Sequence, residues 1–301
     1  MIVAPTFVAT PGIVSRDFAS RVHAIGRAIS PEPNKALYAP LHPPESLGGV
    51  KVSRDLRYGP HQRNRLDVFA PEVPAAGPLP VLLFVHGGGY VGGDKHGPDT
   101  PFYTNIGAWA ARNGMVGVNM TYRLAPEAAW PAAQVDIAQA LQWMRENIAG
   151  HQGDPQRIYL MGHSAGASHA ANYLADTAFH AGGGPGVVGA ILVSALYQLE
   201  AFKPSEGFRQ YHGADASTVA LRSPMRGLLA SPVPMLFAVA EHDLPDYNVQ
   251  ADLMLEALAA AGNKNRFLML TDHNHLSEVY AVNTADTGLA DEIRGLVNNT
   301  E

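Results

Sequence analysis

The sequence has no cysteine and few charged residues, and both features narrow the chemistry that the chain can perform. None of its 301 residues is cysteine, which excludes disulfides, thiolate metal sites and a cysteine nucleophile. Charged residues make up 16% and the net charge is −6 without any basic run, so we expect no nucleic-acid partner. The chain is 47% hydrophobic, which is typical of a globular protein with a sizeable core.

Long apolar runs are also missing. The sequence holds no stretch of about 18 apolar residues, so it predicts no membrane span. Residues 1–10 include an apolar stretch, but no lysine or arginine precedes it, and Pro5 and Pro11 interrupt the region. That pattern is not typical of a secretory signal, and a cytoplasmic protein is the expectation. The oligomeric state is left open, with a homodimer as one option.

Short apolar runs alternate with longer amphipathic segments over most of the chain. We predict strands at 81–85, 115–120, 158–161, 187–193, 235–240 and 266–270, after an antiparallel pair at 51–58 and 65–69. We predict helices at 106–112, 132–148, 165–177, 249–261 and 288–297. This alternation predicts an α/β protein with a mostly parallel central sheet and helices on both faces. Such sheets place their ligand sites at the carboxyl ends of the strands.

Two regions depart from the alternation. Residues 1–50 combine an amphipathic helix predicted at 14–29 with an irregular, proline-rich connector at 31–44. Residues 197–231 lose their periodicity and are interpreted as an insertion. We therefore predict an N-terminal arm or cap segment at 1–50 and a catalytic domain at 51–301, in which the insertion forms a small helical cap.

A G-x-S-x-G motif, GHSAG at residues 162–166, stands where a predicted strand meets a predicted helix. A serine on such a sharp turn leaves little room, so the positions two before and two after it must be nearly free of side chain. The unpaired N–H groups at the start of the helix would face whatever the serine attacks. Since the motif also arises by chance, Ser164 is a candidate nucleophile that depends on finding its partners.

The acid and base that an activated serine needs follow it in the expected order. Glu241 and Asp243 come directly after one predicted strand, and we select Asp243 as the acid with Glu241 as its competitor. His273 and His275 follow the last predicted strand, and we select His275 as the base with His273 as the alternative. A metal site at these two histidines is a weaker hypothesis, because no partner cluster is evident. No metal or cofactor is expected.

The stretch HGGG at residues 86–89 follows another predicted strand. Its glycines allow backbone N–H groups to turn into the site, and we predict Gly88, Gly89 and Ala165 as the donors that stabilise an oxyanion. His86 is expected to fix the loop by hydrogen bonding. The same glycines match the G-x-G-x-x-G pattern of dinucleotide-binding proteins, but consecutive glycines often produce that match by chance. The acidic residue that binds the ribose in such proteins is also not found at a strand end about 20 residues later.

Together with these motifs, residues 50–297 resemble the α/β-hydrolase superfamily, and within it the hormone-sensitive-lipase-like carboxylesterases. The resemblance rests on HGGGY at 86–90, on YRLAPE at 122–127 followed by WPAA, and on GHSAG at 162–166. It implies the α/β-hydrolase fold and supports Asp243 as the acid. In that family the middle block is structural.

The resemblance carries further implications for single residues. Arg123, Glu127 and Asp136 would make polar contacts that hold loops beneath the site. His163 departs from the lipase-like esterases, which usually have aspartate before the nucleophile. Together with VSALYQL at 193–199, it is similar to the kynurenine formamidase and feruloyl-esterase-like branches. We interpret His163 as a packing residue whose side chain points away from the substrate.

These observations predict a serine hydrolase that cleaves carboxylic esters of small to medium acyl chain through an acyl-enzyme. An arylformamidase-type amide hydrolase with the same triad is the alternative. The expected partner is a small-molecule ester. The predicted apolar pocket consists of Phe18, Tyr90, Tyr197, Phe202 and Phe208.

Overall fold

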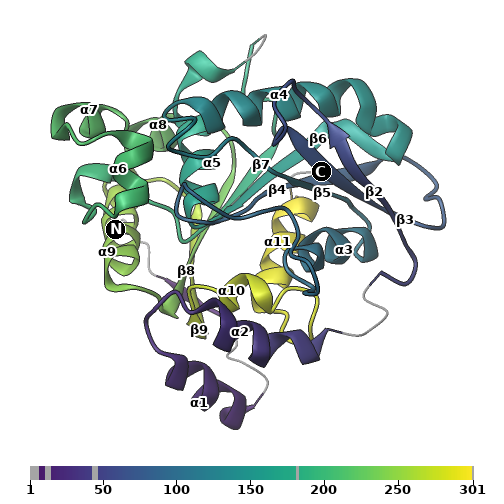
Figure 1. The fold of residues 1–301 in the computed structure, drawn as a ribbon, viewed down its shortest axis with the longest axis horizontal. Helices are drawn as coiled ribbons and strands as arrows, with labels where there is room; N and C mark the ends of the chain where they lie inside the picture. Colours follow the sequence, from purple (N-terminus) through teal and green to yellow (C-terminus); the bar gives the residue numbers. More distant parts are fainter. Residues whose placement is uncertain (1–6, 11–14, 43–46, 181–182, 300–301) are drawn as a thin grey trace.

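The computed structural model describes residues 7–10, 15–42, 47–180 and 183–299, and it has a central sheet as its main feature (Figure 1). The described strands are β1 (Val8–Ala9), β2 (Val50–Arg57), β3 (Arg65–Pro71), β4 (Leu79–Val85), β5 (Val116–Met120), β6 (Gly153–His163), β7 (Gly189–Val193), β8 (Met235–His242) and β9 (Arg266–Asn274). They pair in the order β1-β9-β8-β7-β6-β4-β5-β3-β2. β3 is antiparallel to both β2 and β5, and the other pairs are parallel.

Helices surround this sheet. They are α1 (Arg16–Ile25), α2 (Pro31–Tyr38), α3 (Thr104–Arg112), α4 (Ala132–Asn147), α5 (Ala165–Ala175), α6 (Glu206–His212), α7 (Ala216–Leu221), α8 (Met225–Ala230), α9 (Pro245–Ala260), α10 (Ser277–Tyr280) and α11 (Gly288–Asn299). No helix in the described part of the chain is long and apolar enough to cross a membrane.

Strand β4 shows how one apolar run supplies two cores. Val81, Leu83 and Val85 belong to the core shared with α4, α5 and α9. Leu82 and Phe84 belong to the core on the other face, shared with α3 and α11. Because successive side chains of a strand point to opposite faces, a strand covered on both sides must be apolar throughout. The predicted parallel sheet with helices on both faces is confirmed.

The arm differs from its prediction in two respects. The segment predicted as an irregular connector contains α2, which begins at Pro31. Proline suits the first turn of a helix, because the N–H that it lacks would have no partner within the helix and its fixed φ is close to the helical value. Helix α1 is shorter than the predicted 14–29, because Gly26 adopts a φ of 80° and ends it; residues 11–14 lie outside the described residues. The arm also supplies β1, which pairs with β9.

The region 197–231 contains three short helices, α6, α7 and α8, drawn in green beside α5 and α9 in Figure 1. Each of α6 and α7 begins at a residue whose side chain caps it: Ser205 accepts a hydrogen bond from the Phe208 N–H, and Asp215 from the Thr218 N–H. Helices this short show little periodicity, which explains why the sequence pattern did not predict them.

The strand register brings the carboxyl ends of the central strands to one edge. Val85 pairs with Gly162, and His163 with Val193, so the residues that follow β4, β6 and β7 are neighbours. β8 and β9 extend beyond their predicted ends and pair again at His242 and Asn274 after a register shift. The loops that carry the predicted acid and base therefore leave adjacent strands.

Helix α3 packs against β5 through two glycines. A Cβ at Gly117 of β5 would lie 2.5 Å from the carbonyl oxygen of Gly107 in α3. This distance is far below van der Waals contact, so the helix and the sheet can approach this closely only without a side chain there.

We expect Gly117→Ala to lower the free energy of unfolding by about 1–3 kcal/mol, because an added methyl group in a dense core forces the backbone apart. Urea unfolding of the purified protein measures this change. Gly150→Ala is the matched control, since nothing lies within 4 Å of its Cβ position. Equal stability of the two variants would contradict the packing argument.

Candidate active site

The candidate nucleophile stands on a strained turn between β6 and α5. Ser164 has a φ of 56°, a left-handed conformation that side chains other than glycine rarely adopt. A Cβ at Gly166 would lie 2.2 Å from the carbonyl oxygen of Val85, and one at Gly162 would lie 2.6 Å from the backbone of Ala167. The two glycines of the motif are therefore required by the close approach of α5 to the neighbouring strands.

The structure brings the three predicted triad residues together. His275 Nε2 lies 2.8 Å from Ser164 Oγ, and His275 Nδ1 lies 2.8 Å from Asp243 Oδ1. All three side chains are buried. Asp243 also accepts a hydrogen bond from the backbone N–H of Leu244 at 2.7 Å, which helps to hold its carboxylate. This arrangement is the one in which a histidine can remove a proton from serine while an acid orients it.

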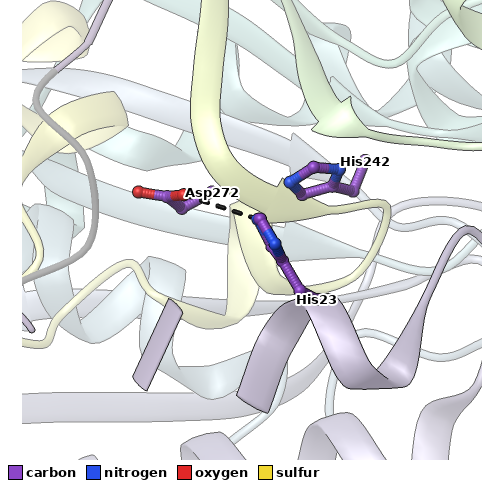
Figure 2. Close-up of side chains that lie close together, drawn as sticks. All are labelled: His23, His242 and Asp272. Atoms are coloured by element: carbon purple, nitrogen blue, oxygen red, sulfur yellow. Dashed lines mark ion pairs between the residues drawn. The ribbon is translucent and has the colours of Figure 1, made fainter. Parts of the chain in front are cut away.

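The competing acid is used elsewhere. Glu241 Oε2 accepts a hydrogen bond from the backbone N–H of Asp272 at 3.0 Å, and so connects the ends of β8 and β9. The residues next to it face helix α1, where His23 lies close to His242 and Asp272 (Figure 2). The structure thus pairs His275 with Asp243 and not with Glu241.

The competing base also has other partners. His273 Nδ1 lies 3.0 Å from Ser277 Oγ, and His273 Nε2 lies 3.1 Å from Asp286 Oδ2. Both ring nitrogens of His273 are thereby occupied, as are both nitrogens of His275. A metal ion shared by these two histidines does not fit this arrangement.

The glycine loop after β4 lies beside the serine. Gly88 has a φ of 138°, and a Cβ there would lie 2.1 Å from the carbonyl oxygen of Gly92. Gly88 and Gly89 line the same cavity as Ser164 and His275. Ala165 is the first residue of α5, where helical N–H groups have no partner within the helix. These positions suit the predicted oxyanion donors, whose role stays a prediction.

His86 holds this loop from below. Its Nδ1 donates a hydrogen bond to the carbonyl oxygen of Gly87 at 2.6 Å, and its ring stacks on Tyr122. Tyr122 in turn donates its hydroxyl to the carbonyl oxygen of His86 at 2.8 Å. Burial lowers the pKa of His86 to about 4, so the ring is neutral at pH 7 and suited to fixing the loop.

A cavity of about 640 Å³ opens beside Ser164. The arm contributes Ile29, Pro31 and Lys35 to its wall, and the segment before α3 contributes Phe102 and Tyr103. The arm therefore borders the site, although it lies far from the serine in the sequence.

The predicted pocket is corrected by this lining. None of its five aromatic residues lines the cavity beside Ser164; these are Phe18, Tyr90, Tyr197, Phe202 and Phe208. Phe18 packs edge-on against Tyr38 between α1 and α2, and Tyr90 stacks on Tyr211 of α6. These rings cover apolar surface between elements, which is the more common use of an aromatic side chain.

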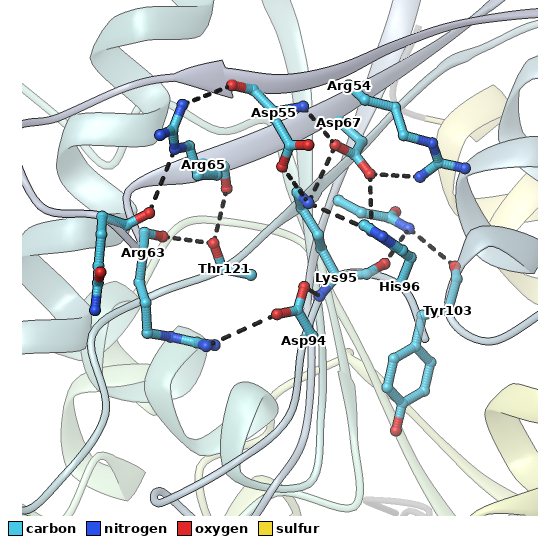
Figure 3. A network of polar contacts seen from close by, with 12 residues as sticks. Arg54, Asp55, Arg63, Arg65, Asp67, Asp94, Lys95, His96, Tyr103 and Thr121 are labelled. Carbon is cyan, nitrogen blue, oxygen red and sulfur yellow. Dashed lines mark hydrogen bonds and ion pairs between the residues drawn. The ribbon is translucent and has the colours of Figure 1, made fainter. Parts of the chain in front are cut away.

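A polar network, shown in Figure 3, anchors the segment that forms another part of the cavity wall. Lys95 is only 3% exposed, and its Nζ lies 2.8 Å from Asp55 Oδ1 and 3.3 Å from Asp67 Oδ1. Arg54 also pairs with Asp67 at 2.6 Å. Since His96, the next residue along the chain, lines the cavity, this cluster around the buried Lys95 and Asp67 fixes the wall on β2 and β3.

Two of the three residues from the middle block behave as the resemblance implied. The Nε of Arg123 donates to the carboxylate of Asp136 at 2.9 Å, and the backbone N–H of Arg123 donates to the same group at 2.8 Å. Asp136 is fully buried, so this pair ties the loop after β5 to α4. Glu127 differs, because its side chain is exposed.

A second buried carboxyl group lies behind the triad and was missed from the sequence. Ser194 Oγ lies 2.5 Å from Asp243 Oδ2 and 3.1 Å from Glu278 Oε2. Burial, and then the nearby charge of Asp243, raise the pKa of Glu278 well above its usual range. The serine hydroxyl has one proton to donate to Asp243, and a protonated Glu278 can donate its own proton to the serine oxygen.

His163 has a larger role than the predicted packing. Its Nε2 donates to the carbonyl oxygen of His275 at 2.7 Å and lies 3.1 Å from Glu278 Oε1. Burial lowers the pKa of His163 well below its usual value, so the ring is neutral. His163 also belongs to the lining of the cavity, and the direction of its side chain relative to the substrate stays a prediction. His163 thus holds the backbone of the candidate base.

Tyr247 of α9 is another neighbour that the sequence pattern did not indicate. Its hydroxyl lies 3.4 Å from Ser164 Oγ, and its ring centroid lies 4.6 Å from that of His275. The helix begins two residues earlier than Tyr247, at Pro245, directly after the acid loop. Nothing in the spacing along the chain shows that the start of α9 reaches the serine.

Solved structures of esterases share this architecture. Esterase B of Lactobacillus rhamnosis, crystallised with a tributyrin phosphonate inhibitor, matches with a TM-score of 0.74 over 96% of this chain and 97% of that one, at 18% sequence identity. The chain has the α/β-hydrolase fold. This finding confirms the fold that the sequence motifs implied.

Sequence comparisons lead to proteins that are named as esterases. A family model described as BD-FAE matches residues 66–180. The isoprenylcysteine alpha-carbonyl methylesterase ICME of Arabidopsis thaliana is 28% identical over 81% of this chain and 59% of that protein. The carboxylesterase NlhH of Mycobacterium tuberculosis is 38% identical over 48% of this chain and 43% of that protein. The chain thus spans less than two thirds of the length of either relative.

The buried Glu278 leads to a pH-dependent prediction. Because its folded-state pKa is raised, the stability that it contributes is present at pH values below its unfolded pKa of about 4.3 and is lost as the pH rises above that value. Glutamine cannot titrate, so we expect Glu278→Gln to gain stability relative to the unmodified protein as the pH rises above that value.

The difference in melting temperature between the two proteins, measured at several pH values, tests this effect. The other titrating groups are the same in both proteins, so their contributions cancel in the difference. Glu256→Gln is the control, because Glu256 is exposed on α9 and should give a flat difference. A flat difference for Glu278→Gln would mean that Glu278 is ionised in the folded protein.

Proposed function

We propose that this α/β-hydrolase is a serine carboxylesterase that cleaves small-molecule esters through an acyl-enzyme. The observation that carries the proposal is the chain of contacts from Ser164 to His275 to Asp243, with both distances at 2.8 Å. The named esterase relatives support the same reaction. They give no support to the formamidase alternative.

In the proposed mechanism each group has its own step. Ser164 Oγ attacks the ester carbonyl carbon while its proton passes to His275 Nε2, and Asp243 stabilises the resulting imidazolium. The backbone N–H groups of Gly88, Gly89 and Ala165 hold the oxyanion. His275 then protonates the leaving alcohol. A water molecule, deprotonated by His275, attacks the acyl-enzyme and releases the carboxylic acid.

Two segments are proposed as the cap over this site. The arm, residues 1–50, supplies Ile29, Pro31 and Lys35 to the cavity wall. The insertion, residues 197–231, packs against the oxyanion loop, where a Cβ at Gly207 would lie 2.3 Å from the carbonyl oxygen of Gly89. The arm would thus shape the substrate cavity, and the insertion would fix the loop that holds the oxyanion.

The triad makes a sharp kinetic prediction. Ser164→Ala and His275→Ala should each lower kcat for p-nitrophenyl butyrate by about 10⁴–10⁶-fold, because triad residues act as a unit. His273→Ala should retain kcat within about tenfold, because its contacts are structural. Steady-state assays of folded variants test this. Unchanged hydrolysis by Ser164→Ala would refute the mechanism, and a greater loss in His273→Ala would reverse the assignment of the base.

The cavity volume predicts the acyl preference. A space of about 640 Å³ accommodates short and medium chains, so kcat/KM should be at least about tenfold higher for p-nitrophenyl butyrate or hexanoate than for the palmitate ester. A series of p-nitrophenyl esters measures this preference, with N-formylkynurenine as the amide comparison. An optimum at palmitate would contradict the small cavity, and a large preference for the formamide would overturn the esterase proposal.

A further inference from the structure

Three side chains that can bind a metal meet on the far side of the acid loop (Figure 2). His23 comes from α1, His242 from the end of β8 and Asp272 from the end of β9. Their ligand atoms all lie within 4.8 Å of one another. His23 Nε2 and Asp272 Oδ1 are 3.5 Å apart, and the two imidazole rings have centroids 3.8 Å apart. The triad uses none of these side chains.

A fourth candidate ligand stands beside the cluster. Glu241 Oε2 lies 3.9 Å from His242 Nε2, and the backbone N–H of Asp272 donates to the same oxygen at 3.0 Å. A carboxylate oxygen retains a lone pair after accepting one hydrogen bond, so Glu241 can still bind an ion. Glu241 and Asp272 together place two negative charges near the two imidazoles. Arg27, which donates a hydrogen bond to the carbonyl oxygen of Asp243, adds one positive charge nearby.

His242 has an unused nitrogen at the centre of this group. Its Nε2 is buried and has no hydrogen-bond partner among the described residues, and an unsatisfied buried polar atom is costly. A cation would give this nitrogen a partner.

The distances and donor types select the kind of ion. Ligand atoms about 2.0–2.2 Å from Zn²⁺ in a tetrahedral site are roughly 3.3–3.6 Å apart, which fits the 3.5 Å between His23 and Asp272. Two imidazoles favour Zn²⁺ over Mg²⁺ or Ca²⁺, which prefer oxygen ligands. The ligand atom of His242 lies within 4.8 Å of the other two, so a small rotation of its side chain would bring it to the ion.

We propose that His23, His242 and Asp272 bind one Zn²⁺, with Glu241 as the fourth ligand. The ion would be structural, because it would join helix α1 to the ends of the two strands that carry the candidate acid and base. His242 directly precedes Asp243, and the chain after α1 lines the cavity through Ile29 and Pro31. Zinc would therefore hold the arm in the position that forms the cavity wall.

The test is titration of the chelator-treated full chain with zinc chloride by isothermal calorimetry. We expect one Zn²⁺ per chain, and we expect binding to weaken by about 100-fold or vanish in His23→Ala and in Asp272→Asn, because even residues that only support a metal ligand cost 10–100-fold. Both sites are partly exposed, and asparagine tolerates the φ of 62° at position 272. Circular dichroism checks that each variant is folded.

His151→Ala is the matched control, because His151 lies before β6 at the opposite end of the sheet. It should bind Zn²⁺ like the unmodified protein. Hydrogen exchange gives a second measurement: zinc should slow exchange of the α1 amides in the unmodified protein and not in His23→Ala. Failure of the unmodified protein to bind Zn²⁺, or binding by both site variants as tight as that of the unmodified protein, would overturn the proposal. Neither result depends on hydrolysis, so the esterase proposal is tested separately.

Discussion

The close approach of helix α5 to strands β4 and β6 is the constraint on which the candidate site depends. The contact of Gly166 with the Val85 carbonyl leaves no space for a side chain, and Ser164 takes up the strain in its backbone. This packing holds the serine at the sheet edge where His275 can reach it. The packing of the neighbouring buried strands holds the turn in this strained conformation, whereas an isolated loop would relax to an unstrained one.

The sheet and the three triad residues could be predicted because their signals lie in short stretches of sequence. An apolar run such as residues 81–85 indicates a strand covered on both faces, and a glycine two positions from a serine indicates a tight turn. Asp243 could also be chosen over Glu241, because it lies further past the strand, has the shorter side chain and matches the acid that the family resemblance implies. The structure adds that β8 extends to His242, which brings Asp243 directly to the strand end.

Other parts of the site depend on contacts between distant segments, and no local pattern shows them. Glu278 looks like an ordinary helix residue until α10 places it against Ser194 and Asp243. The aromatic residues chosen for the pocket have the right chemistry, but they pack between helices, while Ile29 and Pro31 of the arm form the wall. The helix at Pro31–Tyr38 was hidden by prolines that are compatible with a first turn.

The pairing of β1 with β9 has a consequence for how the protein is made. The backbone N–H of Thr10 donates to the carbonyl oxygen of Met269, a residue 259 positions later in the chain. The arm is synthesised before β9, the strand with which it pairs, and more than 200 residues separate the two. The segment that walls the cavity must therefore wait, undocked, while the sheet assembles.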